Sequence, residues 1–265
     1  MIIKVLGCHG SELTIDNGNG RPLECRTCGF LVNETCMLDA GSVSAGLFEA
    51  EQDKIRHVLL SHAHFDHIKG LPLLADNLVG RNLPHGPVQV RALPEVLDDL
   101  RRHIFNDAIF PDFTRLPTPD TALLAYRPFD DEKTFTFDGL EVTAVRVDHT
   151  VPATGFIIRE GDAALLYSGD TSETRRIWEV AAKEPRLKAA FIETSFPNDC
   201  HELAKVSGHL TPEMLAREFV KIGRPDLPVY IYHLKPSYRS VIIAELKRLN
   251  LPNLSVLTEG QVVRL

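Results

Sequence analysis

Residues 61–70, SHAHFDHIKG, place three histidines and an aspartate within six positions, directly after an apolar segment. His62 and His64 lie two positions apart where the chain leaves a predicted strand, so both side chains can project to the same side and hold one metal ion. Asp66 and His67 follow where the chain is predicted to turn into a helix, and they can reach a second ion. Imidazole and carboxylate ligands suit zinc, manganese or iron. The alternative for this segment alone is a solvated His-rich loop, or histidines that cap the following helix.

Three other segments end apolar strands with the same types of side chain. VRVDHT places His149 at a predicted strand end, LLYSGDT does so for Asp170, and VYIYHLKP for His233. Polar groups at the ends of several strands are expected to lie together at one edge of the fold, as one rim. The sequence therefore predicts a two-metal site there, and not an isolated histidine-rich loop.

The elements that must position this rim alternate between strands and helices. We expect a hairpin of Gly29–Val32 and Thr35–Leu38 that turns at Asn33-Glu34, and a long loop over residues 106–127. The other predicted strands are Ile55–Ser61, Val88–Ala92, Thr134–Phe137, Leu140–Val147, Gly155–Arg159, Ala163–Ser168, Ala189–Glu193 and Val229–His233, with two more near Leu254 and Val262. The predicted helices are His67–Leu78, Pro94–Phe105, Thr174–Ala182, Thr211–Gly223 and Ser237–Leu249. This order predicts an α/β fold of two mixed sheets face to face with outer helices, in a single domain over residues 1–265.

Composition narrows the class of function. The 265 residues include 29 basic and 36 acidic side chains, a formal net charge of −7, so a nucleic acid is not the expected partner. No segment is typical of a signal peptide or a membrane helix, which predicts no membrane association. Five cysteines in a chain of this size predict reduced thiols and a cytoplasmic location. Cys25 and Cys28 have the spacing of half a zinc knuckle, but no second pair follows. We therefore expect these two thiols to be buried or to lie in a loop, without a structural zinc.

The complete pattern resembles the metallo-β-lactamase-fold hydrolases. It consists of His62-Ala-His64-Phe-Asp66-His67 followed by His149, Asp170 and His233. The resemblance implies a four-layered αβ/βα sandwich and two divalent metal ions, with zinc expected and manganese or iron as alternatives. It assigns His62, His64 and His149 to one ion, Asp66, His67 and His233 to the other, and Asp170 to both.

Within that superfamily, HAHFDHIKGL, RHIFNDAIFPDF, YSGDT, IETSFPN and SGHLTPE are similar to the class II 3′,5′-cyclic-nucleotide phosphodiesterases. Phe65 departs from that group, which usually has leucine there. The segments around Glu193 and His209 are also similar to ribonuclease Z. The resemblance implies hydrolysis of a small phosphodiester such as cAMP to a 5′-monophosphate, by attack of a metal-bridging hydroxide.

The same resemblance gives three residues catalytic roles. Asp66 is expected to orient or deprotonate the attacking water as well as to bind metal. His209, paired with Glu193, is expected to remain protonated and to act as general acid on the leaving oxygen. The alternative for His209 is a helix-capping or core histidine.

Substrate contacts are expected from a loop and a lysine. Lys235 can contact phosphate, or it is an ordinary surface lysine. Asn106 can hydrogen-bond a base edge, and Phe110 and Phe113 can stack on it, unless the two phenylalanines pin the loop to the core.

Four rival functions remain open beside the cyclic-nucleotide phosphodiesterase. They are an RNA-processing nuclease, a thioester or β-lactam hydrolase, a di-iron redox protein and a metal-dependent binding protein without turnover. The acidic chain counts against the nuclease, and His64 counts against the redox protein, which has a glutamate at the second ligand. The expected partner is a small-molecule phosphodiester, and a homodimer is possible.

Overall fold

The computed structural model describes residues 1–16, 20–251 and 253–265, and within these ranges most strands belong to two seven-stranded sheets. The first sheet has the order β16 (Val262–Arg264), β1 (Ile2–Gly7), β4 (Gly29–Val32), β5 (Cys36–Leu38), β6 (His57–Leu59), β7 (Val88–Ala92) and β8 (Leu124–Pro128). The second has the order β15 (Leu254–Val256), β14 (Val229–Tyr232), β13 (Leu187–Glu193), β12 (Ala163–Tyr167), β11 (Thr154–Glu160), β10 (Leu140–Arg146) and β9 (Thr134–Phe137). Both sheets are mixed, because parallel pairing at one side gives way to antiparallel pairing at the other.

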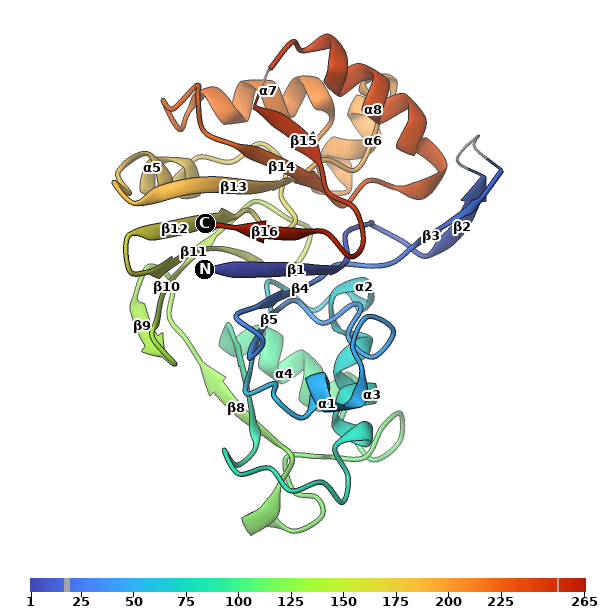
Figure 1. Ribbon diagram of the computed structural model, residues 1–265, viewed down its shortest axis with the longest axis vertical. Helices are drawn as coiled ribbons and strands as arrows, with labels where there is room; N and C mark the ends of the chain where they lie inside the picture. The colour runs from blue at the N-terminus through green and yellow to red at the C-terminus, as the bar shows by residue number, and fades with distance from the viewer. Residues whose placement is uncertain (17–19, 252) are drawn as a thin grey trace.

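Helices cover the outer face of each sheet (Figure 1). Those of the N-terminal half are α1 (Glu49–Gln52), α2 (Phe65–Ile68), α3 (Gly70–Asn77) and α4 (Pro94–His103), and they lie on the side of the first sheet. Those of the C-terminal half are α5 (Arg176–Ala182), α6 (His201–Val206), α7 (Pro212–Val220) and α8 (Arg239–Arg248), and they pack on the second sheet. The predicted four-layered sandwich is confirmed. Among the described residues, no helix has the length and apolar character needed to cross a bilayer.

Alternation along the strands of the second sheet builds two separate apolar layers. In β12, Leu165 and Tyr167 join the cluster between the two sheets, whereas Ala164 and Leu166 join the cluster beneath α5 to α8. Successive side chains of a strand point to opposite faces, so a strand buried on both faces reads as a continuous apolar run. Such strands end abruptly where the sequence turns polar, and these ends carry the candidate site.

Several predicted elements match the structure closely. The hairpin at Asn33-Glu34 is confirmed, because β4 pairs with β5 in antiparallel register and both turn residues have positive φ. Helix α7 begins at Pro212, and the Thr211 side chain caps it by accepting a hydrogen bond from the Met214 amide at 3.4 Å. The prediction of one domain over residues 1–265 stays a prediction.

Other elements differ from the prediction. The helix expected over His67–Leu78 is divided into α2 and α3 at Lys69, and β6 is shorter than the predicted strand. The loop expected over residues 106–127 contains a 3-10 turn, Pro119–Thr121, and the start of the edge strand β8. An edge strand that ends in proline gives a weak pattern in sequence. The exposed ribbon of β2 (Leu13–Asp16) and β3 (Pro22–Cys25) was also not predicted, nor were α1 and α6.

Candidate metal centre

The seven residues predicted as metal ligands come together at one edge of the sandwich. His62 and His64 follow β6, and Asp66 and His67 lie on α2, so these four come from the first sheet and its helix. The remaining ligand candidates follow three strands of the second sheet, namely His149 after β10, Asp170 after β12 and His233 after β14. The site is therefore built between the two sheets, from residues up to 171 positions apart in sequence (62 to 233).

The ligand atoms form two groups with one carboxylate between them. Nitrogen atoms of His62, His64 and His149 lie within 4.8 Å of one another, and the His64 Nδ1 is 3.1 Å from the His149 Nε2. The other group joins the His233 Nε2 to the His67 Nε2 at 3.2 Å and to the Asp66 Oδ2 at 3.4 Å.

Asp170 lies between these groups. Its Oδ2 atom is 3.8 Å from the His62 Nε2, 3.2 Å from the His67 Nε2 and 3.1 Å from the His233 Nε2. The Asp170 side chain is 1% exposed, so the carboxylate faces the histidines and not solvent. This position suits a carboxylate shared by two cations.

Hydrogen bonds at Nδ1 fix the rings of the first group. The His62 Nδ1 lies 2.9 Å from the Ser61 Oγ, and Ser61 donates its own proton to the Asp39 Oδ2 at 2.8 Å. The His149 Nδ1 donates to the Gly208 carbonyl at 2.8 Å. A side chain at position 208 would meet the His149 ring, because a Cβ there would lie 2.6 Å from Nδ1, so the contact requires glycine. Both histidines thus keep Nε2 as a lone-pair donor.

The second group is held in the same way. The His67 Nδ1 donates to the Asp39 Oδ2 at 2.8 Å. The His233 Nδ1 lies 2.7 Å from the Ser195 Oγ, which donates to the Glu193 Oε2 at 3.0 Å. Two buried carboxylates therefore orient the ligand histidines from behind, an arrangement typical of metal-bound imidazoles.

Asp39 was not predicted, although the sequence carried a signal for it. It follows β5 in the segment CMLDAG, so it terminates an apolar strand as the predicted ligands do. It also accepts a hydrogen bond from the Tyr167 hydroxyl at 2.6 Å. The Asp39 carboxylate accepts hydrogen bonds from Ser61 and His67 and so helps to orient the ligand rings. Ser61 and Ser195 were missed because a serine next to a strand end has no distinctive pattern.

Burial decides the charge of most ligand histidines. It lowers the pKa of His62 well below the ordinary value, lowers that of His64 to about 4, and also lowers that of His233. Neutral imidazole is the metal-binding form. His67 is different, because burial opposes protonation but the Asp170 and Asp39 carboxylates outweigh it and raise its pKa.

Two buried polar atoms without a hydrogen-bond partner indicate that these residues fit a divalent metal. The His62 Nε2 and the Asp170 Oδ1 are buried and have no hydrogen-bond partner within the described residues. Buried polar atoms in native proteins normally have a partner, and one left without requires an explanation. A cation held between nitrogen and carboxylate donors would supply that partner and would offset the charge of Asp170.

His209 and Glu193 form a pair beside the second group. The His209 Nδ1 donates to the Glu193 Oε1 at 2.8 Å, and its ring stacks on that of His233 with centroids 5.1 Å apart. Burial lowers the pKa of His209, but the Glu193 carboxylate outweighs this effect and the pKa is raised. A histidine held in this way remains protonated at higher pH than a free one, with Nε2–H as its available donor.

The predicted substrate residues lie in three different settings. The Asn106 Oδ1 accepts hydrogen bonds from the amides of Ala108 and Ile109 at 3.1 and 2.8 Å, so it shapes its own loop. Phe113 is 4% exposed and belongs to the apolar core of the first sheet, where its ring contacts that of Phe105. The Lys235 Nζ donates to the Gly10 carbonyl at 2.6 Å. The structure therefore does not present Phe113 for stacking, since the apolar loop had to be anchored to the core.

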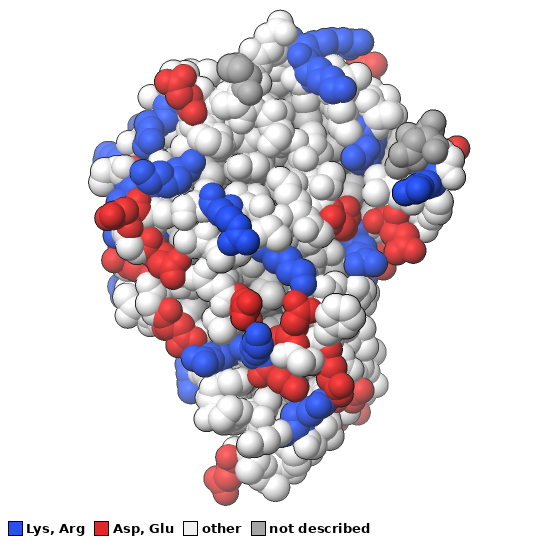
Figure 2. Space-filling view, viewed as in Figure 1, with Lys and Arg blue, Asp and Glu red and all other residues white. Residues whose placement is uncertain are grey.

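A cavity of about 340 Å³ adjoins the centre. Its lining includes the exposed side chains of Phe65, Leu73 and Ile109, the half-buried Phe110, and Lys69. Phe65 is the residue between the ligand candidates His64 and Asp66, so the chain leads from these two residues directly to the cavity wall. On the face of the molecule in Figure 2, Lys and Arg side chains alternate with Asp and Glu.

Comparisons with known proteins agree with this geometry. A family model described as a beta-lactamase superfamily domain matches residues 39–231. A probable 3′,5′-cyclic-nucleotide phosphodiesterase of Yersinia pestis is 28% identical over 231 residues, which cover 75% of this chain and 64% of that protein, less than two thirds of its length. A 3′,5′-cyclic-nucleotide phosphodiesterase of Aliivibrio fischeri is 28% identical over 251 residues, covering 77% of this chain and 73% of that protein. A ribonuclease Z of Pseudomonas putida is 34% identical over 110 residues, covering 40% of this chain and 30% of that protein.

Solved structures share the fold along the whole chain. Unliganded yeast PDE1 superposes with a TM-score of 0.81 and 19% identity, covering 100% of this chain and 99% of that one. The short form of human tRNase Z gives a TM-score of 0.67 and 17% identity, covering 100% and 99%. At these identities the likeness establishes the fold alone.

Proposed function

Since the chain belongs to the beta-lactamase superfamily, whose family model matches 193 residues (39–231), we propose that it is a metal-dependent hydrolase of 3′,5′-cyclic nucleotides such as cAMP. The product is the nucleoside 5′-monophosphate. The two curated relatives named above as cyclic-nucleotide phosphodiesterases support the substrate class. The observation that carries the proposal is the buried pair of His209 and Glu193 beside the ligand cluster, because an alkoxide leaving group needs a proton donor there.

The metal centre takes two divalent ions, with zinc preferred over manganese or iron. His62, His64 and His149 would hold one ion and Asp66, His67 and His233 the other, with Asp170 between them. When bound, the ions lower the pKa of water and offset the negative charge of a phosphodiester. Asp66 also orients the attacking water: hydrogen bonding to His233 and the nearby His67 outweigh its burial and lower the pKa of its carboxyl, so the ionised group can accept a hydrogen bond from water.

His209 supplies the proton for the leaving oxygen. As the bond between phosphorus and O3′ breaks, O3′ takes the proton from the His209 Nε2, and solvent later restores it. Glu193 holds the ring by its Nδ1–H and favours the protonated form. Through Ser195, the same carboxylate also orients His233, so proton donor and metal ligand keep a fixed relation.

The cavity beside Phe65 is the proposed place for the nucleobase. A flat base suits walls formed by Phe65, Ile109 and Phe110. Asn106 contributes by holding the amides of the loop that carries Ile109. Phe113 contributes only by anchoring that loop, and Lys235 is a candidate contact for the phosphate from its position two residues after His233.

A ribonuclease Z-like activity on RNA is the second candidate. The match to the Pseudomonas putida ribonuclease Z supports it over 110 residues. The net charge of −7 counts against it, because a polyanion needs many basic contacts away from the reaction site. The expected partner is therefore a small phosphodiester. A cytoplasmic location, suggested by the five cysteines, completes the proposal.

A hydrolysis screen with zinc-loaded protein tests the function. The substrates are 3′,5′-cyclic nucleotides, a linear aryl phosphodiester, a thioester and a precursor transfer RNA. The proposal expects cyclic nucleotides to give the highest kcat/KM, with 5′-monophosphates as products. Cleavage of the precursor RNA without turnover of any cyclic nucleotide would transfer the assignment to the second candidate.

A further inference from the structure

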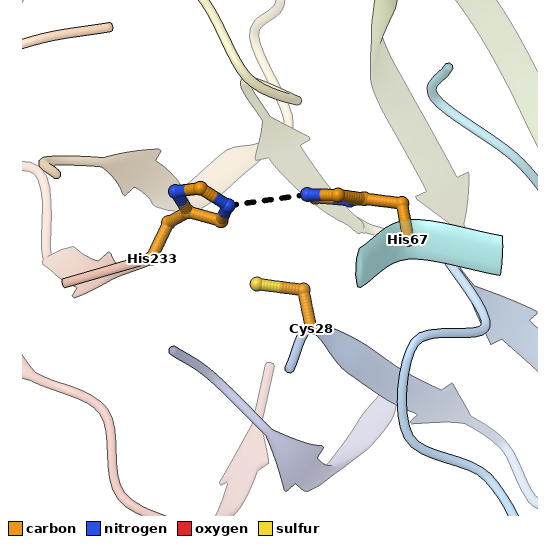
Figure 3. Close-up of side chains that lie close together, drawn as sticks. All are labelled: Cys28, His67 and His233. Carbon is orange, nitrogen blue, oxygen red and sulfur yellow. Dashed lines mark hydrogen bonds between the residues drawn. The ribbon is translucent and has the colours of Figure 1, made fainter. Parts of the chain in front are cut away.

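A buried thiol lies against the second group of ligands. Cys28 directly precedes β4 and is 0% exposed. Its Sγ and ring nitrogens of His67 and His233 all lie within 4.8 Å of one another. Figure 3 shows the sulfur below the gap between the two rings, whose facing Nε2 atoms are 3.2 Å apart. A sulfur donor thus lies close to two of the residues assigned to the second ion.

The position of this sulfur is fixed by backbone contacts. The Gly41 amide donates to the Cys28 carbonyl at 2.8 Å, and a Cβ at Gly41 would lie 2.7 Å from that same carbonyl oxygen, so the two segments approach closely. Among the residues that the structure describes, the thiol makes one hydrogen-bond contact, a long one to the His9 carbonyl at 3.6 Å. A weak S–H donor gains little from such a contact, which leaves the sulfur available to a metal.

Thiolate coordination changes the chemistry of the site. A bound dication would take the Cys28 sulfur as a thiolate, and the displaced thiol proton would go to solvent. Thiolate favours zinc, whereas carboxylate and imidazole alone also accept manganese.

We propose that Cys28 is a ligand of the ion held by Asp66, His67 and His233, and that it makes this position selective for thiophilic metals. The inference rests on the metal centre of the proposed function. It adds a soft donor to a group of nitrogen and oxygen donors. In this scheme the first ion, held by His62, His64 and His149, has no sulfur ligand.

Cobalt(II) titration of the metal-free chain tests the proposal without measuring turnover. Wild-type protein should bind two cobalt ions, and a sulfur-to-cobalt charge-transfer band in the near ultraviolet should appear with one of them. In Cys28→Ser that band should be lost, while the visible bands of the other cobalt ion remain. Metal binding should also release one proton fewer than in the wild type. Cys28→Ala provides the same test if the serine variant does not fold.

Two matched variants make the assignment specific. Cys36→Ser alters another buried thiol of the first sheet and should keep the band. Cys8→Ser alters the thiol that lies near His9 and Glu259, where ligand atoms also lie within 4.8 Å of one another, and it should keep the band as well. A band that survives in Cys28→Ser but disappears in Cys8→Ser would overturn the proposal.

Metal selectivity gives a second readout. Zinc affinity at the weaker-binding position should fall in Cys28→Ser by at least roughly 10–100-fold, the usual cost of removing a hydrogen-bond partner of a metal ligand. Manganese affinity should change little. Equal losses for both metals, or a wild-type cobalt spectrum without a sulfur band, would contradict the role of Cys28. A wild-type protein that binds no pair of cobalt ions would instead contradict the proposed metal centre.

Discussion

His209 and the ligand histidines differ in which groups surround them. Four of the candidate ligand rings use Nδ1 for Asp39, Ser61, Ser195 or the Gly208 carbonyl and offer Nε2 to the centre, namely those of His62, His67, His149 and His233. His209 instead donates to a carboxylate, and the pKa of its ring is raised. In the proposed function, the neighbours of each histidine thus decide whether it acts as a metal ligand or as a proton donor.

This division predicts a selective effect of His209→Ala. Turnover of a cyclic nucleotide should fall by about 10²–10⁴-fold, the usual contribution of a general acid, while metal content stays unchanged. The loss should be much smaller for an activated aryl phosphodiester, whose leaving group hardly needs a proton. His201→Ala is the control, since His201 is an exposed histidine on α6 with 43% of its side chain accessible. Equal losses on both substrates would remove His209 from the role of general acid.

The loop of residues 106–113 is the element expected to set substrate affinity. Asn106→Ala removes the acceptor for two loop amides, so the apolar wall at Ile109 loses its shape and KM for a cyclic nucleotide should rise. The kcat for a simple aryl phosphodiester should change little. Phe113→Ala is the comparison, and it should lower the free energy of unfolding by about 3–5 kcal/mol because it empties a core position. Unchanged KM in Asn106→Ala would exclude the loop from substrate binding.

Strand β6, which leads into the ligand segment, contains a histidine with a pH-dependent effect on stability. His57 is buried against Phe137 with ring centroids 4.1 Å apart, and burial lowers its pKa although Asp138 partly opposes this. Because the folded pKa lies below the unfolded value of about 6.5, the folded state binds fewer protons, and the stabilising contribution of neutral His57 is lost as pH falls below that value.

Comparison with His57→Phe isolates this contribution. The urea midpoint of the wild type, measured relative to that of the variant, should decline from about pH 8 to about pH 5, on either side of the ordinary histidine pKa. The other histidines are common to both proteins and cancel in the difference. A difference that is independent of pH, or one that grows in favour of the wild type in acid, would contradict the effect of burial on His57.

The elements also explain what the sequence could and could not predict. The ligand strand ends were predicted because a continuous apolar run that stops at a histidine or aspartate is a strong local pattern, as at Asp170. Strand β8 and the ribbon of β2 and β3 were missed because edge and exposed strands lack that pattern. The position of Cys28 near His67 and His233 depends on how β4, α2 and the segment after β14 come together, and no local pattern contains that information.

At the scale of the whole molecule, charge distinguishes a small substrate from a polyanion. The chain carries 29 basic and 36 acidic residues, and they alternate on the face in Figure 2. KM for a cyclic nucleotide should therefore change only weakly between about 0.05 and 0.2 M salt, whereas a protein with many phosphate contacts loses affinity steeply over that range. Initial rates at several salt concentrations, with ionic strength as the one variable, measure this. A steep rise of KM with salt would favour an extended nucleic acid.

The two sheets together supply the ligands, so activity should depend on filling the whole site between them. The most direct measurement is the rate of 3′,5′-cAMP hydrolysis as zinc is added back to metal-free protein, with bound zinc per chain measured in the same samples. We expect the rate to reach its plateau at two bound zinc ions per chain, with 5′-AMP as the product. A plateau at one bound ion, or two bound ions without hydrolysis of any cyclic nucleotide, would contradict the assignment of this chain as a dinuclear cyclic-nucleotide phosphodiesterase.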